Sequence, residues 1–299
     1  MISRMKIYLH EMYPVPQRLL ASFLMTSGFL ALLSGLCVRP FRLDSLEVII
    51  GTMAVFMLML ILRLMDELKD LEIDKTLFAH RPVPSGRVYE KDIHISLIVL
   101  CLGFILIHTY RAEVLISAIL LLGYCGLMYK YFFIPNILRR YLLLNLATHN
   151  PVIALVFGHI TVIFLSGSDN GSAADPVLIL PLILSFWASL FAWEIARKIR
   201  SPREEDAYVT YSQIFGRTGA VAIAAFAQLA ALVLFLIIIF RLGLPIMAGL
   251  PMIVAFPGLV LGYLRFLKYP VPRNADLKMQ AEGYILVMGV NSLITVLIL

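Results

Sequence analysis

The stretch RLMDELKDLEIDKTLFAHRPVPSG, residues 63–86, follows the fifteen uncharged residues Val48–Leu62 and begins with a segment that carries five carboxylates. Asp66, Asp70 and Asp74 recur at every fourth position, so in a helix they lie on one stripe that drifts slowly around the axis. Like charges at this spacing repel one another, and a helix gains nothing from them unless cations lie between them. The stretch therefore predicts a polar, cation-binding end on a hydrophobic helix.

Hydrophobic runs recur along the whole chain. Its 299 residues are 61% hydrophobic and only 15% charged, and the mean hydropathy is +0.89. This composition excludes a soluble domain and indicates an integral membrane protein. A spanning helix needs about 20 mostly apolar residues. Nine spans are predicted from the uncharged runs, which are Leu19–Val38, Val48–Leu62, Ile93–Tyr110, Val114–Tyr129, Tyr141–Ser168, Pro176–Trp193, Thr218–Phe240, Leu242–Leu264 and Gly283–Leu299.

The expected fold is an all-α membrane protein, with nine transmembrane helices in one bundle and a single domain over residues 1–299. No cleavable signal peptide is expected, because the first run is too long for such a segment and no small-residue cleavage site follows it. A compact chain without an expected targeting segment favours a location in a prokaryotic plasma membrane.

The net charge of +6 fits membrane orientation better than nucleic-acid binding. With the amino end inside, 21 of the 25 Lys and Arg residues fall in inward segments, because only Arg39, Arg42, Arg111 and Arg241 fall outward. Such a bias marks the cytoplasmic side. The amino end is therefore predicted to be cytoplasmic, and the ends of spans two and six, which carry acidic residues, emerge on that same side.

The acidic stretch has two readings at this point. A carboxylate in the middle of a bilayer costs roughly 2.5–3.5 kcal/mol, so these side chains belong in a polar cavity or at the interface. Oxygen ligands that leave coordination positions open suit Mg²⁺, which often bridges carboxylates to phosphates, and Arg81 suits bidentate phosphate binding. The alternative is a solvated helix of mixed charge, in which Lys69 and Lys75 pair with the acids.

The motif resembles the first motif of the UbiA superfamily of intramembrane prenyltransferases, NDxxDxxxD, followed seven residues after its last Asp by RP(I/L)PSG. Here DELKDLEID ends at Asp74 and RPVPSG begins at Arg81. The resemblance implies that Asp66, Glu67, Asp70 and Asp74 hold Mg²⁺ on an isoprenyl diphosphate and that Arg81 binds the diphosphate. Asp66 stands where the family has Asn, and Glu67 where it has Asp.

The family's second motif, DxxxD at the end of span six, is altered. Glu194 keeps a carboxylate at its first position and is expected to act with Asp70 and Asp74 as a catalytic metal ligand, whereas Lys198 puts a cation at the second. Arg197 and Lys198 would then bind the diphosphate, or residues Glu204–Asp206 would fold back as replacement ligands. The number of Mg²⁺ ions stays open, and so does the plain alternative of an ion pair between Glu194 and Lys198 at a helix end.

Two further segments carry candidate residues. In GLMYKYFFIPN, Lys130 is a candidate diphosphate contact beside Tyr129, or simply an interfacial cation beside an aromatic belt. In LNLATHNP, Asn145 and His149 share a helix face, and Asn150 follows. With Tyr129 these residues are candidates for an acceptor pocket, although polar side chains in spans also hydrogen-bond neighbouring helices.

The resemblance favours a Mg²⁺-dependent prenyltransferase that transfers the prenyl group of an isoprenyl diphosphate to a lipophilic, aromatic or other, acceptor. A terpene cyclase on the same scaffold, which needs no acceptor, is the alternative. A transporter or lipid-binding protein without catalysis is a third hypothesis, supported by the two substitutions in the first motif.

Overall fold

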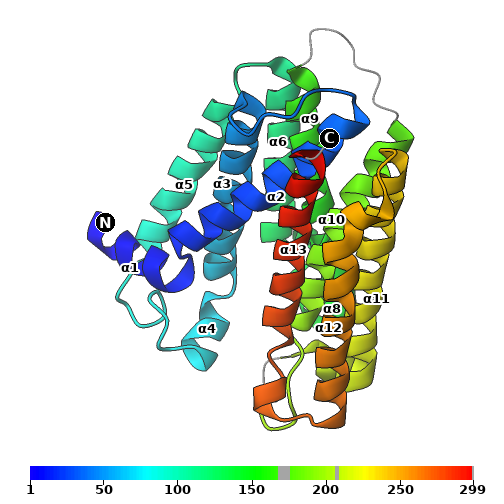
Figure 1. Cartoon of the computed structure of the whole chain (residues 1–299). Helices are drawn as coiled ribbons and strands as arrows, with labels where there is room; N and C mark the ends of the chain where they lie inside the picture. Colours follow the sequence, from blue (N-terminus) through cyan, green and yellow to red (C-terminus); the bar gives the residue numbers. More distant parts are fainter. Residues whose placement is uncertain (168–175, 206–208, 298–299) are drawn as a thin grey trace. The chain divides into compact units, whose positions relative to one another are not determined.

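The chain is all-helical in the computed structural model, which describes residues 1–167, 176–205 and 209–297 (Figure 1). The α-helices are α1 (Ile2–Met12), α2 (Val15–Leu36), α3 (Leu46–Lys69), α4 (Leu71–Leu77), α5 (Glu90–Ile107), α6 (Ala112–Tyr129), α7 (Pro135–Arg140), α8 (Leu142–His149), α9 (Pro151–Ser166), α10 (Pro176–Ala196), α11 (Tyr211–Arg241), α12 (Leu250–Lys268) and α13 (Leu277–Leu297). Three short 3₁₀ turns complete the described elements: η1 (Tyr131–Phe133), η2 (Ile246–Gly249) and η3 (Pro272–Asn274). The prediction of an all-α fold is confirmed for these ranges.

Each of the nine hydrophobic runs contains a helix in the described part of the chain, and α8 and α9 share one run. Seven of these segments are long and apolar enough to cross a membrane: Val15–Leu36, Leu46–Lys69, Ala112–Tyr129, Leu142–Ser166, Val177–Ala196, Tyr211–Arg241 and Ile246–Lys268. Helices α5 and α13 are not among the seven. The chain is therefore an integral membrane protein, while the number of nine spans stays a prediction for α5 and α13.

The chain forms two compact units, each with its own packed interior. Unit 1 comprises Met1–Thr26 and the described part of Leu43–Asp169, and unit 2 comprises Ser27–Arg42 and the described part of Asn170–Leu299. Helix α2 therefore contributes residues to both units. The first acidic motif belongs to unit 1 and the second to unit 2.

In unit 1, α3 packs against α5 and α9, and α6 packs against α9. Gly51 allows α2 and α3 to approach closely, since a Cβ there would lie 2.8 Å from the Thr26 Cγ2. At the other end of α3, Leu64 lies in a buried apolar cluster with Tyr8 of α1 and Val88 of the α4–α5 loop. The end of α3 that carries the first motif is thus fixed by contacts from α1 and from that loop.

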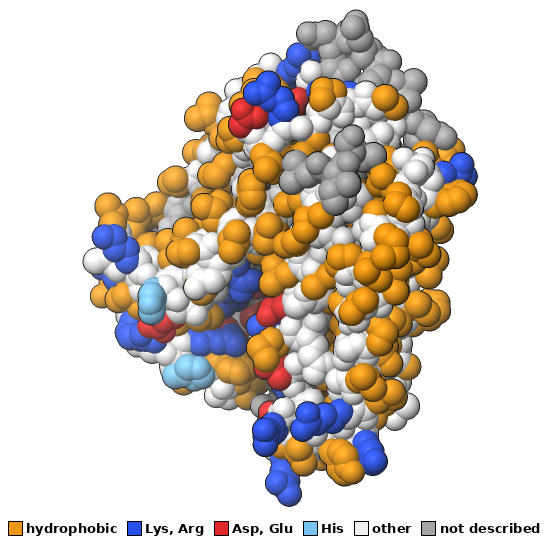
Figure 2. Space-filling model, in the orientation of Figure 1, with side chains coloured by type: hydrophobic (Ala, Val, Ile, Leu, Met, Phe, Trp, Pro, Cys, Tyr) orange, Lys and Arg blue, Asp and Glu red, His pale blue; other side chains and the backbone are white. Residues whose placement is uncertain are grey.

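In unit 2, α10 and α11 form the main helix pair, and α13 packs against α10 and α12. Buried hydroxyls link the pair: Ser185 donates to the Ala231 carbonyl at 2.9 Å, and Ser189 donates to the Gln228 Oε1 at 3.2 Å. Figure 2 shows hydrophobic side chains over the visible face of α11 and α12, with Lys and Arg gathered around the α12–α13 connection. An apolar face suits contact with lipid, and a basic end suits the membrane–water interface.

Two helix breaks lie beside the predicted site residues of unit 1. Pro151 lacks an N–H and begins α9, so the fifth hydrophobic run divides into α8 and α9 at Asn150. Asp70 lies between α3 and α4 with φ −104° and ψ 8°, outside helical geometry. Both breaks place a polar residue of the predicted site where one helix ends and the next begins.

Candidate functional site

The first acidic motif keeps its one-turn spacing across the α3–α4 break. The Asp70 N–H donates to the Asp66 carbonyl at 2.9 Å, and the Asp74 N–H donates to the Asp70 carbonyl, also at 2.9 Å. Backbone bonds between residues four apart are those of an α-helix. The predicted stripe of Asp66, Asp70 and Asp74 is therefore confirmed in its backbone spacing, although the helix itself changes at Asp70.

The three aspartates differ in their surroundings. Asp66 is exposed and Asp70 half-buried, whereas Asp74 is only 5% exposed. The Arg81 Nη1 donates to the Asp74 Oδ2 at 2.8 Å, and the Arg81 guanidinium lies 3.8 Å from the centroid of the Phe78 ring. The structure thus brings together the last acid of the motif and the first residue of RPVPSG, because the pair neutralises a carboxylate that would otherwise be costly to bury.

Glu67, the second carboxylate of the motif, is fully buried. Its Oε2 accepts a hydrogen bond from the Arg63 Nη2 at 2.7 Å, and the Tyr8 hydroxyl of α1 lies within 3.3 Å of the same oxygen. Its Oε1 is buried without a hydrogen-bond partner. Glu67 therefore links α1 to α3 through one oxygen and keeps the other available to a ligand, and its role as a Mg²⁺ ligand stays a prediction.

Lys69 and His149 form a contact between α3 and α8 beside Asp70. The Lys69 ammonium lies 3.1 Å from the His149 Nε2, 3.4 Å from the Met128 carbonyl oxygen and 3.9 Å from the centroid of the Tyr131 ring. The His149 Nδ1 lies 2.9 Å from the Asn145 carbonyl oxygen, and its Nε2 lies 3.2 Å from the Met128 carbonyl oxygen. A lysine and an imidazole are thus held next to the first motif.

Tyr131 lies in an aromatic turn with an unusual backbone. Tyr131, Phe132 and Phe133 have φ values of 49°, 50° and 61°, in the left-handed region that costs an L-residue roughly 1–2 kcal/mol. The Tyr131 hydroxyl donates to the Asp70 Oδ1 at 3.3 Å, and the Arg139 guanidinium lies 4.9 Å from the ring centroid. Burial and the Asp70 carboxylate raise the pKa of Tyr131 to about 12, so the hydroxyl stays protonated and donates to Asp70.

The predicted acceptor residues are partly brought together. Asn145 and His149 both lie on α8, as their spacing predicted, and Asn150 is 7% exposed where α9 begins. The Oδ1 atoms of Asn145 and Asn150 are buried without hydrogen-bond partners. At the end of α6, the Lys130 ammonium lies 5.1 Å from the ring centroid of its neighbour Tyr129. The amides thus offer open polar atoms, whereas the contact of Lys130 with Tyr129 is local.

In unit 2, Glu194 forms ion pairs with both cations of the altered second motif. Arg197 donates to both carboxylate oxygens, with Nη2 and Oε1 2.8 Å apart, and the Lys198 ammonium lies 3.5 Å from the same Oε1. The Glu194 side chain is 17% exposed. The predicted i, i+4 ion pair is therefore present, and a direct role for Glu194 at a metal would require it to share its oxygens with Arg197.

Glu204 and Glu205, the candidate replacement ligands, are engaged in local structure. The Glu204 Oε2 accepts from the Ser201 hydroxyl at 2.6 Å. The Glu205 carboxylate accepts from the Thr210 hydroxyl at 2.7 Å and from the Ser212 hydroxyl, at the start of α11. These bonds shape the α10–α11 connection. Asp206, the third candidate, lies outside the described residues.

The donor set of unit 1 fits Mg²⁺ chemically. Among the described residues, no three His, Cys, Asp or Glu side chains lie close enough to form a metal site by themselves. Mg²⁺ does not require three, because it is commonly held by one or two carboxylates and completes its shell with water and substrate phosphates. Asp66 and Asp70, one turn apart, supply two such oxygen donors, and the open Glu67 Oε1 is a third buried one.

Several residues of this site cannot be identified from the sequence alone. The sequence indicates Lys69 only as a partner of the acids, and it does not indicate Tyr131 or Arg139. Tyr131 directly follows the predicted Tyr129 and Lys130, so its position offered a weak signal. The contact of Lys69 with His149 joins residues 80 positions apart and left no signal in the sequence.

Two solved structures are similar to this chain in fold. A solved structure of a digeranylgeranylglyceryl phosphate synthase is similar to the chain with a TM-score of 0.64, at 18% sequence identity, over 99% of this chain and 100% of the other. The apo structure of a UbiA homologue from Aeropyrum pernix K1 has a TM-score of 0.65, at 14% identity, over 92% of this chain and 97% of the other. At such identities the two structures establish the fold alone. No curated protein sequence matches the chain.

The sequence profile of the UbiA prenyltransferase family matches residues 23–286. The matched range covers most of the chain and includes the first motif, RPVPSG and the second motif. The chain therefore belongs to the UbiA prenyltransferase family.

Proposed function

We propose that the protein is a Mg²⁺-dependent intramembrane prenyltransferase that ionises an isoprenyl diphosphate and transfers its prenyl group to a lipophilic acceptor. The observation that carries the proposal is the Asp74–Arg81 pair at 2.8 Å. It joins the carboxylates of the first motif to a guanidinium that suits a diphosphate. Asp74 lies on α4 and Arg81 in the loop that follows it, just beyond the end of the apolar helix α3, where an amphiphilic substrate can place its charged and its apolar parts.

The reaction breaks the bond between C1 of the prenyl chain and the diphosphate oxygen. Pyrophosphate leaves with the bonding electrons, C1 bonds to a nucleophilic atom of the acceptor, and that atom then loses its proton. Arg81 binds the phosphate oxygens on which negative charge develops, which stabilises the transition state. Apolar helix faces exclude water from the allylic cation.

Asp66, Glu67, Asp70 and Asp74 are the proposed carboxylate ligands of Mg²⁺. When bound, the ion neutralises charge on the diphosphate and favours its departure. The Tyr131 hydroxyl, which donates to the Asp70 Oδ1, orients this carboxylate. In the second motif, Glu194, Arg197 and Lys198 remain candidates for metal and diphosphate binding.

The acceptor is proposed to contact Tyr129, Asn145, His149 and Asn150. The open amide oxygens of Asn145 and Asn150 are hydrogen-bond acceptors that a ligand hydroxyl or N–H would satisfy. A lipophilic acceptor is also supported by the neighbour named as digeranylgeranylglyceryl phosphate synthase, since that name describes prenyl groups on a glyceryl phosphate. The basic ends of the helices favour an active site on the cytoplasmic side, and we place the protein in a prokaryotic plasma membrane.

Purified protein in lipid nanodiscs tests the proposal. The protein is given C10, C15 or C20 allylic diphosphate with Mg²⁺, first alone and then with a membrane extract, and pyrophosphate and organic-extractable products are measured. Turnover that needs the extract is expected. A cyclic terpene formed without any acceptor would instead establish the cyclase alternative, and diphosphate binding without turnover in either condition would favour a binding protein.

A further inference from the structure

The loop that carries Arg81 connects α4 to α5 and is a compact turn. The Ser85 N–H donates to the Arg81 carbonyl at 3.0 Å, and the Val88 N–H donates to the Pro82 carbonyl at 2.9 Å. Gly86 has a φ of +75°, a conformation that glycine adopts without a steric cost. The position of Arg81 therefore depends on how this whole turn, residues 78–89, is held.

Arg87 closes the turn from within and is itself held by α1. Its Nη2 donates to the His80 carbonyl at 2.8 Å, and its Nε donates to the Ser85 hydroxyl at 3.1 Å. The same guanidinium makes a bidentate ion pair with Glu11, with Nη2 and Oε2 2.9 Å apart. Hydrogen bonding to Arg87 lowers the pKa of Glu11, so this carboxylate is ionised at neutral pH. Bidentate arginine–carboxylate pairs fix orientation as well as distance.

A second bidentate pair holds the far end of the turn. Arg4 of α1 binds Asp92 in the first turn of α5, with Nη2 and Oδ1 2.9 Å apart, and its guanidinium lies 4.3 Å from the centroid of the Tyr89 ring. Arg4 and Glu11 are seven residues apart, which is about two turns of α1. The two pairs thus attach the turn to α1 at two separate points.

Between these two points, α1 and the turn share an apolar core. Tyr8 and Tyr13 lie in one buried cluster with Val83 and Val88 of the turn and with Leu64 of α3. The Tyr8 hydroxyl also lies 3.3 Å from the buried carboxylate of Glu67 in the first motif. The first motif and the Arg81 turn are therefore packed against the same helix.

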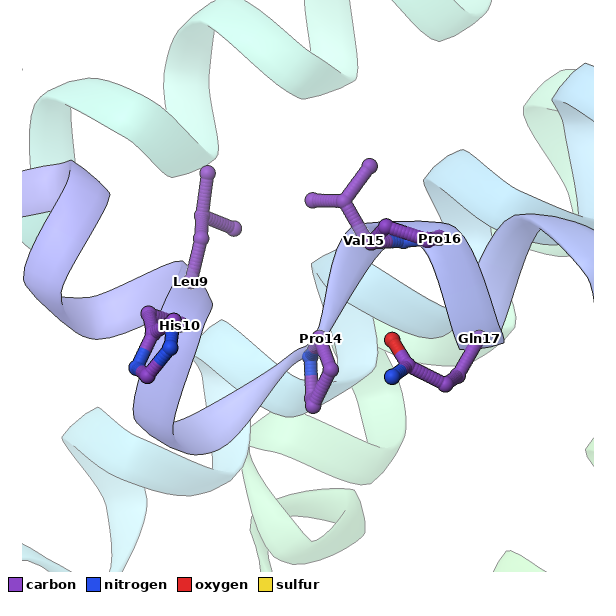
Figure 3. Close-up of a pocket in the computed structure, with 6 residues that line it drawn as sticks. All are labelled: Leu9, His10, Pro14, Val15, Pro16 and Gln17. Atoms are coloured by element: carbon purple, nitrogen blue, oxygen red, sulfur yellow. The ribbon is translucent and has the colours of Figure 1, made fainter.

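The corner between α1 and α2 is packed on one side and open on the other. Tyr13 is 4% exposed, and its hydroxyl donates to the Phe56 carbonyl of α3 at 2.8 Å. Pro14 precedes α2 and Pro16 lies in its first turn, and an open pocket of about 410 Å³ lies at the corner, lined by Leu9, His10, Pro14, Val15, Pro16 and Gln17 (Figure 3). Beside this open pocket, α1 is held by its contacts with the 78–89 turn, α3 and α5.

We propose that α1 is a brace for the diphosphate-binding turn, in which Glu11 and Arg4 are positioning residues that act on Arg81 through Arg87 and Asp92. This proposal rests on the proposed function, since it assumes that Arg81 binds the diphosphate. Neither positioning residue needs to contact the substrate. Loosening the brace is expected to lower kcat/KM for the isoprenyl diphosphate, because Arg81 both binds the diphosphate and stabilises its departure.

Glu11→Gln tests the brace, with Glu90→Gln as the matched control. Glu90 is also exposed and carries the same charge, but its ion-pair partner His94 lies on its own helix. In nanodiscs, Glu11→Gln should lower kcat/KM for the isoprenyl diphosphate about fivefold, as expected for the loss of one exposed ion pair. Amides of residues 80–89 should exchange hydrogen for deuterium faster, whereas Glu11→Asp and Glu90→Gln should stay close to the wild type in both measurements.

Unchanged exchange in Glu11→Gln would overturn the brace, and so would an unchanged kcat/KM. The exchange measurement needs no turnover. If the wild type releases no pyrophosphate from any substrate, the proposed function fails, while the exchange rates of the 78–89 turn still decide whether α1 holds it.

Discussion

At the scale of single residues, Asp74 is the buried acid of the first motif that pairs with Arg81, whereas the buried Glu67 pairs with Arg63. An asparagine at this position keeps the shape and removes the charge. We expect Asp74→Asn to lower pyrophosphate release by about 100-fold or more, the range seen when one preorganised electrostatic contact is lost. Release is measured in nanodiscs, with membrane insertion and yield compared to the wild type.

Glu72→Gln is the matched control for Asp74→Asn. Glu72 lies two residues away, but its side chain is 85% exposed and pairs with Lys75 on the same helical turn. Its neutralisation should leave pyrophosphate release unchanged. If Asp74→Asn kept full activity, or if both variants lost it equally, Asp74 would not have the specific role assigned to it.

At the scale of elements, the end of α2 carries a strain that one substitution should relieve. The Arg39 N–H donates to the Ser34 carbonyl and the Val38 N–H to the Gly35 carbonyl, which is a Schellman motif with Val38 at the left-handed position. Val38 has a φ of 52° and is 92% exposed, so its side chain contributes little packing. Val38→Gly should stabilise the protein by about 1 kcal/mol.

The prediction for Val38 is measured as a rise in the midpoint of thermal unfolding in detergent. Val38→Ala keeps the Cβ and removes only the branching, so it is expected to raise the unfolding midpoint less than Val38→Gly does. A lower midpoint for Val38→Gly than for the wild type would mean that the left-handed geometry at this helix end is not strained.

The attachment of α1 to α5 should weaken in acid. Hydrogen bonding to Arg4 lowers the pKa of Asp92 to about 2, from an ordinary value of 3.8. Because folding lowers this pKa, the ionised Asp92 contributes its stabilisation fully above about pH 4 and loses it as the pH falls toward 2. The difference in unfolding midpoint between the wild type and Asp92→Asn should therefore shrink between pH 5 and about pH 2.5.

Arg4→Gln provides the control for this pH dependence. In that background Asp92 lacks its partner, so replacing Asp92 by Asn should change the midpoint little at any pH. A difference that persists in the Arg4→Gln background would assign the effect to the bond between Asp92 and the Tyr89 N–H at the start of α5.

At the scale of the whole molecule, local patterns predicted the elements, and long-range contacts could not be predicted. The hydrophobic runs correctly predicted where the helices lie, and the aspartates keep their predicted one-turn spacing across the break at Asp70. Both features depend only on residues that are close in sequence. The burial of Glu67 depends on Tyr8, 59 residues away. The left-handed turn at Tyr131 contradicts the ordinary preference of aromatic residues, so only tertiary contacts could have indicated it.

The orientation of the chain can be tested together with α5, one of the two predicted spans outside the seven segments. Helix α5 begins with Glu90, Lys91 and Asp92 and is not among the seven segments that are apolar enough to cross. Exposed residues flank it on both sides, Ser85 before it and Thr109 after it. If the amino end is cytoplasmic and α5 crosses, these two positions lie on opposite sides of the membrane.

Single cysteines at these positions, in a chain whose Cys37, Cys101 and Cys125 are replaced by serine, report the topology. In intact cells a membrane-impermeant maleimide should label Thr109→Cys and should label Ser85→Cys only after permeabilisation. The reverse pattern would contradict the cytoplasmic amino end. Equal labelling of both positions would show that α5 does not cross, and the Arg81 turn and the α5–α6 connection would then lie on one face of the membrane.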